Sequence, residues 1–305
     1  MRVQLNPIVK KDLQVTARSM RFSWGLFAYE AVVALAFLLG LSSIQSSVDG
    51  YYGDGNIYQE LINLFPVLAI AQVCIVSLIV PVMTASSISG EKERQTFDIM
   101  MTTCMSPLSI VFGKVSSAVL RVLFYVMGSL PVMALSFVVG GLSWSVLFYF
   151  VLAVIVLSVF AGSIGILCSS LCRRSISAVI LTFVMYFVLN ILTFCPLFVY
   201  LFGSWEEESM GECLLPLLFN PNVFFEEFFM QVMTGESILG STGESNFIKT
   251  EVGYLTYCFT YGKVWVFLSA GCILLLAFLF MLIAAWRIDP LSAAAERKPA
   301  KKKSK

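Results

Sequence analysis

Long apolar stretches separated by short polar connections dominate this sequence. Six of them are long enough to cross the hydrocarbon core of a bilayer as helices, which takes about 20 consecutive apolar residues. They cover residues 22–44, 61–86, 110–139, 144–167, 176–200 and 264–286. We therefore predict an all-α membrane protein with six transmembrane helices, which form a single transmembrane domain over residues 1–305.

Composition favours the bilayer as the solvent of this chain. Hydrophobic residues make up 58% of the sequence and charged residues 13%, whereas a soluble domain has about 45–50% and about 25%. A water-soluble fold could not hide so much apolar surface. The chain contains no histidine, which removes the commonest general base and the usual zinc ligand. We expect no metal site and no enzymatic activity of its own.

Lysines and arginines indicate how the chain is oriented. They concentrate before the first stretch, between the second and third, between the fourth and fifth, and in the tail 287–305, whereas the other connections contain only Lys249 and Lys263. Because basic residues near spans stay in the cytoplasm, we predict a multi-pass protein of the cell membrane with both termini cytoplasmic. The basic tail would contact anionic lipid.

A basic amphipathic segment, residues 1–21, precedes the first stretch. Asn6 and Pro7 place an N-cap residue before a proline at the first helical position, which favours a helix start. Side chains of one helix face then recur at helical spacing, namely Val9, Leu13, Thr16 and Met20. We expect this helix to lie along the inner membrane interface before the chain turns into the first span.

The connection 201–263 is the longest and would lie outside the cell. Its apolar and aromatic part, residues 213–233, is interrupted by two prolines and carries acidic residues that argue against a full crossing. We predict short helices that lie at the outer face or dip into it. Cys213 and Cys258 could form a disulfide in an oxidising exterior, although their separation in sequence does not give the geometry.

Two charged residues fall well inside the predicted spans, Glu30 in the first and Arg121 in the third. Charged groups at such depth are costly and suggest a function. Both lie at a similar depth from the inner side, so we hypothesise that they pair or face a common inner cavity. The alternative is that one or both side chains extend to the interface.

The connection between the second and third spans, residues 89–107, has a mixed charged and apolar pattern. Ser89 could cap a short helix, with Glu91 and Glu93 in its first turn. Its apolar face would consist of Phe97, Met100, Met101 and Cys104. From the pattern alone, this face either docks into a groove of a partner protein or rests on the membrane as a solvated connector.

The same segment resembles the first cytoplasmic loop of the type-2 ABC transporter permease family. That loop has an acidic–basic cluster, a T-F-D-like motif, paired threonines, a serine–proline turn and a G-K that enters the third helix. The matching residues are Glu91, Lys92, Glu93, Arg94, Thr96, Phe97, Asp98, Thr102, Thr103, Ser106, Pro107, Gly113 and Lys114. Cys104 departs from the pattern, because many members have proline there.

The resemblance implies a membrane-spanning permease subunit whose coupling helix docks on an ATP-binding cassette subunit. The docking residues would be Glu91, Glu93, Arg94, Thr96, Phe97, Asp98, Met100 and Met101. This chain has no G-x-x-x-x-G-K-[ST] phosphate loop. It would therefore bind no cofactor itself, and ATP and Mg²⁺ would belong to the partner ATPase.

Six spans make half a transporter in this family, so a second permease chain is expected, as a homo- or heterodimer. The resemblance favours an exporter, and no nucleic-acid partner is expected. Two alternatives remain open from the sequence. One is a secondary transporter or channel, although we find no internal repeat of the kind common in that class. The other is a non-transporting immunity or sensor subunit with the same fold.

Overall fold

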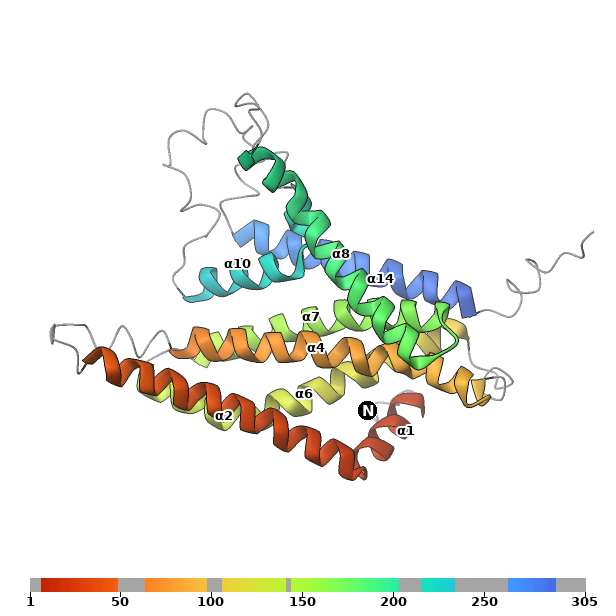
Figure 1. Cartoon of the computed structure of the whole chain (residues 1–305), viewed down its shortest axis with the longest axis horizontal. Coiled ribbons are helices and arrows are strands. Elements are labelled where there is room, and N and C mark those ends of the chain that lie inside the picture. The colour runs from red at the N-terminus through yellow and green to blue at the C-terminus, as the bar shows by residue number, and fades with distance from the viewer. Residues whose placement is uncertain are drawn as a thin grey trace, which may run out of the picture.

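The computed structural model describes residues 7–48, 64–97, 106–140, 144–202, 215–233 and 263–288. Within these ranges the structure is all-α and contains no strand (Figure 1). Its elements, in chain order, are α1 (Pro7–Ala17), α2 (Met20–Val48), α4 (Leu64–Glu93), α6 (Pro107–Gly140), α7 (Trp144–Leu171), α8 (Ser175–Phe202), η2 (Leu215–Phe219), α10 (Pro221–Met233) and α14 (Lys263–Ile288).

Six of these helices are long and apolar enough to cross a membrane, which confirms the six predicted spans. The candidate spans are Phe22–Ser43, Leu64–Glu93, Pro107–Leu135, Trp144–Leu171, Ser175–Pro196 and Val264–Ile288. Most of the helices extend a few residues beyond the apolar stretches. The largest difference is at the end of α4, which continues for seven residues past Ser86.

The bundle is built around α7. This helix contacts α4, α6, α8, α14 and α10. Of the residues in its most apolar 18-residue stretch, 72% are buried, against 11% for α2. Gly165 brings α4 against α7, because a Cβ there would lie 1.9 Å from the Thr84 hydroxyl oxygen. Small residues are the usual means by which membrane helices approach closely. The core therefore centres on the α4–α7 contact, and α2 lies at the periphery.

One end of the bundle, which we call the basic end, contains the end of α4, the start of α6, the α7–α8 turn and the end of α14. Its basic residues are Lys92, Arg94, Lys114, Arg173, Arg174 and Arg287. The predicted N-terminal helix is present there as α1, packed against α6 and α2 (Figure 1). The spacing predicted that Met20 would continue the face of this helix, and that prediction is wrong. The chain turns at Arg18 and Ser19, so Met20 begins α2, where it is 75% exposed.

At the opposite end, η2 and α10 re-enter the bundle. Asn220 donates hydrogen bonds from Nδ2 to Thr193 Oγ1 (2.7 Å) and to the Asn190 carbonyl (3.4 Å). Asn190 lies twelve residues before the end of α8, or about 18 Å along the helix. The described part of the connection 201–263 therefore contains two short helices that pack into the end of the bundle, and their position at the outer face stays a prediction. Cys213 and Cys258 lie outside the described residues.

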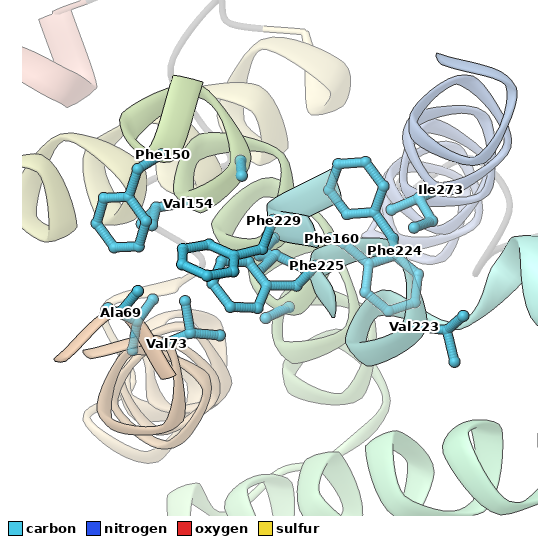
Figure 2. Close-up of a cluster of buried hydrophobic side chains, with 14 of the residues drawn as sticks. Ala69, Val73, Phe150, Val154, Phe160, Val223, Phe224, Phe225, Phe229 and Ile273 are labelled. Atoms are coloured by element: carbon cyan, nitrogen blue, oxygen red, sulfur yellow. The ribbon is translucent and has the colours of Figure 1, made fainter. Parts of the chain in front are cut away.

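Aromatic side chains of α10 fill the space between α4, α7 and α14 (Figure 2). Phe229 stacks on Phe65 of α4 with ring centroids 5.5 Å apart, and Phe225 meets Phe150 of α7 edge-on at 6.3 Å. All four rings are buried. The 13-residue helix α10 is too short to cross the membrane, so it is a packed part of the core and not a seventh span.

Candidate coupling site at the end of α4

The end of α4 differs from the short capped helix that the sequence suggested. Ser89 is not an N-cap: it is fully buried inside α4, and its hydroxyl donates to the Ala85 carbonyl at 2.8 Å. The helix continues because α7 supports it there. Ser169 Oγ accepts hydrogen bonds from the backbone N–H groups of Ile88 (3.0 Å) and Ser89 (2.8 Å). Residues 89–93 therefore form the end of α4 and not the start of a separate short helix.

The chain leaves α4 through a tight turn. The Thr96 N–H donates to the Glu91 carbonyl (3.0 Å), and the Gln95 N–H donates to the Lys92 carbonyl (3.2 Å). This is the hydrogen-bond pattern of a Schellman C-cap, whose left-handed position usually holds glycine. Here Gln95 occupies it with a φ of 59°. Helical backbone resumes at Phe97, so the turn separates α4 from the element that follows.

Three consecutive side chains attach the end of α4 to three different helices. Glu91 Oε1 lies 2.6 Å from Lys114 Nζ of α6. Lys92 Nζ donates to the Ser170 carbonyl of α7. Glu93 Oε2 accepts from the Ser175 hydroxyl (2.7 Å) and backbone N–H (3.2 Å) at the start of α8. A displacement of this end of α4 would therefore act on α6, α7 and α8 together.

Phe97 contributes to the chain's own core as well as to the segment after the turn. Its ring packs against the buried cluster that includes Ile88, Val111 and Ile288, and Lys92 Nζ lies 5.6 Å from its centroid. The sequence pattern placed Phe97 on an exposed apolar face. In the structure its ring is instead partly buried in the chain's own core. The other apolar residues of that face, Met100, Met101 and Cys104, lie outside the described residues, as does Asp98.

The polar side of the turn is open. Glu93, Arg94 and Thr96 are exposed, and a cavity of about 710 Å³ adjoins them. The lining residues are Ser86, Ser87, Gly90, Glu91, Glu93, Arg94, Thr96 and Ser175. A polar cleft of this kind, beside helix ends that carry both signs of charge, suits the charged surface of a protein partner better than an apolar ligand.

The predicted ion pair between Glu30 and Arg121 is not formed. Arg121 Nη2 instead lies 3.8 Å from Asp12 Oδ2 of α1, and the Ser117 hydroxyl donates to the same carboxylate oxygen at 3.2 Å. Sequence reasoning missed Asp12, although its position was informative: it follows Val9 by three residues, which places it beside the stripe that packs on α6. Depth along two helices does not show which way their side chains face.

Six helices long and apolar enough to span define the class, which is a multi-pass membrane protein. A sequence model of the family described as ABC-2 type transporter matches residues 3–201, which include α1 to α8. The chain therefore belongs to the ABC-2 type transporter family, as a membrane-spanning permease subunit. The comparison with curated proteins finds no match to this chain.

Proposed function

We propose that this permease subunit works with a separate ATP-binding cassette subunit, which binds ATP and Mg²⁺, and that hydrolysis drives export of a substrate. The observation that supports the proposal is the attachment of the α4 end to α6, α7 and α8 through Glu91, Lys92 and Glu93. The ATPase would dock on the exposed residues of the turn, Arg94 and Thr96, and on the segment that begins at Phe97.

The mechanical argument follows from the geometry of the turn. A partner that pushes on residues 94–97 acts on the last turn of α4, because the turn is hydrogen-bonded back to Glu91 and Lys92. Those two residues and Glu93 contact three further helices, so a local push becomes a movement of four spans. Packed helices respond to such pushes as rigid elements with discrete arrangements. Nucleotide-driven closure of an ATPase pair would thereby open and close the bundle.

The orientation we propose places the basic end in the cytoplasm of the cell membrane. The lysines and arginines of the described connections gather at this end, as expected for cytoplasmic segments. The amphipathic helix α1 and the end of α14 both lie there, which would leave both termini cytoplasmic. The re-entrant η2 and α10 would then be at the outer face.

A second permease chain would complete the transporter. The spans of α2 and α8 are the least buried of the six: 11% and 22% of the residues in their most apolar 18-residue stretches are buried. Large apolar side chains are exposed along both helices, including Phe27, Leu38, Phe187 and Leu192. We propose that part of this surface meets a second permease chain and the rest meets lipid.

Co-purification with the ATPase subunit tests the docking proposal. Arg94→Glu reverses the charge of an exposed residue at the α4 end, and we expect it to reduce the amount of ATPase retained by about tenfold, as for a charge contact in an interface. Arg18→Glu is the matched control, because Arg18 is also exposed at the basic end but lies in the α1–α2 turn. Equal retention by both variants would show that docking occurs elsewhere.

ATP-dependent transport by the purified complex separates the alternatives. A secondary transporter or channel would move its substrate without ATP and without an ATPase subunit. An immunity or sensor subunit would retain the ATPase and bind its ligand, but the ligand would not cross the membrane. The proposal requires both retention of the ATPase and substrate movement that stops when ATP is withheld.

A further inference from the structure

Glu30 is an intramembrane carboxylate without a polar partner in the part of the chain that the structure describes. The described spans contain three acidic residues, and two of them, Glu91 and Glu93, are paired at the basic end of α4. Glu30 lies ten residues into α2, about 15 Å from the helix start. Its Oε1 atom is enclosed by protein but has no hydrogen-bond partner. Among the described residues no lysine or arginine forms an ion pair with it.

The carboxylate is held in a notch of α6. A Cβ atom at Gly128 would lie 2.4 Å from Glu30 Oε1 and 3.5 Å from the Leu26 side chain, so only glycine leaves room for both groups. Glu30 as a whole is half-buried. It therefore lies at the rim of the α2–α6 contact, with one oxygen held against α6 and the rest of the side chain accessible from the flank of the bundle.

The cation nearest in sequence to this notch is already engaged. Arg121 precedes Gly128 by seven residues, about 10 Å along α6, and its guanidinium is directed to Asp12. A second copy of the chain would not supply the missing charge through its least buried helices either. The helix α8 contains no charged residue, and α2 contains only Arg21, beside the basic end, besides Glu30 itself.

The described residues supply no positive charge for Glu30, and in its ionised form a carboxylate at this depth needs one, because charged groups inside a membrane pair or face a pathway. The exposed apolar side chain of Phe27 lies on the same face of α2, three residues before Glu30. An occupant that satisfies both features has a cationic group on an apolar body. We propose that Glu30 binds the ammonium or guanidinium group of a cationic amphiphile, which is the substrate class of this transporter. The substrate assignment rests on the proposed function; the binding site itself does not.

Equilibrium binding of two probes with the same alkyl tail tests the site. Dodecyltrimethylammonium and dodecanol would be titrated onto the full chain in phosphatidylcholine nanodiscs, with binding to empty nanodiscs subtracted. We expect the native chain to bind the cation about tenfold more tightly than the alcohol, the ratio that corresponds to one good charged contact. Glu30→Gln should abolish this preference and leave dodecanol binding unchanged.

Two further variants keep the test decisive. Glu226→Gln removes an exposed carboxylate of α10 and should retain the preference, which excludes an effect of net charge. Gly128→Ala keeps the carboxylate but fills its notch, so it should change the affinity for the cation several-fold and not that for dodecanol. Equal affinities for both probes in the native chain, or a preference that survives Glu30→Gln, would overturn the proposal.

A transport measurement distinguishes this inference from the proposed function. In vesicles that contain the complex with its ATPase, Glu30→Gln should lose ATP-driven accumulation of the cationic probe and keep ATP hydrolysis. A complex that retains no ATPase contradicts the proposed function, whatever the binding data show. ATP-driven transport of the cation that is equal in the native and Glu30→Gln complexes contradicts the role of Glu30 alone.

Discussion

The ion pair between Glu91 and Lys114 should be a measurable part of the link between α4 and α6. Its two charged atoms lie 2.6 Å apart, and the lysine side chain is 8% exposed while that of the glutamate is 28% exposed. Glu91→Gln and Lys114→Met each remove one charge and leave the other without its partner. Together with the double variant they form a double-mutant cycle, which isolates the pairwise term.

The expected magnitude follows from the geometry. Two unit charges at this separation attract by about 6 kcal/mol at an effective dielectric constant of about 20. Removing both charges from water offsets much of this attraction, and the partial exposure of Glu91 reduces it further. We therefore expect a coupling free energy of about 1–3 kcal/mol. Each single variant should lower the free energy of unfolding by more than half of what the double variant does.

Unfolding in mixed micelles, driven by increasing dodecyl sulfate and followed by circular dichroism, gives the four free energies of the cycle. The same variants, assembled with the ATPase, should hydrolyse ATP with less substrate moved for each ATP. If the two single effects add to the double effect within about 0.5 kcal/mol, the pair contributes nothing. The attachment of α4 to α6 would then have to be reconsidered.

Further predictions concern the packing of α4, the re-entrant segment and the turn after α4. Gly165→Ala should lower the free energy of unfolding by about 1–3 kcal/mol, because the new methyl group would overlap a threonine of α4. Gly271→Ala is the control and should not lower it, because nothing lies within 4 Å of a Cβ at that position. Equal effects would refute the close α4–α7 contact. Asn220→Ala should lower the free energy of unfolding by about 2–3 kcal/mol, since it removes both an N-cap of α10 and the hydrogen bonds to α8. The protease resistance of the α10 region should fall with it. Asn222→Ala, at an exposed residue, is the control and should lower the free energy of unfolding less. Gln95→Gly should raise the free energy of unfolding by about 0.5–1 kcal/mol. Glycine removes the steric cost of the left-handed conformation, and this gain exceeds the entropy that glycine adds to the unfolded chain; a decrease would mean that the turn is not strained.

The spans could be predicted from sequence because their signal is local. A run of about 20 apolar residues has few alternatives to a membrane helix, and all six such runs are helices here. The ends of the helices were harder to predict from sequence. Ser89 followed by two acids has the pattern of a helix start, but in the structure the backbone N–H groups of Ile88 and Ser89 donate to Ser169 Oγ of α7, and the same residues are part of a helix end.

The candidate site could be predicted in part. The segment that carries it was found by resemblance, which named Glu91 and Glu93 as docking residues; docking stays a prediction, and in the structure both carboxylates bond to other helices of the same chain. Their partners could not be predicted, because Lys114 and Ser175 are separated from them by many residues and only tertiary packing brings them together. The same limit applies to Asp12: its spacing from Val9 placed it beside the packed face of the N-terminal helix, but not opposite Arg121 of α6.

Site-specific photo-crosslinking from the end of α4 tests the central claim most directly. A benzophenone side chain would replace Arg94 in the full complex, with the same replacement of Arg18 as the control, because both residues are exposed at the basic end. We predict a covalent adduct with the ATPase subunit from position 94, with a yield that changes when ATP is bound, and none from position 18. An ATPase that co-purifies with the chain but forms no adduct from position 94 would contradict the account.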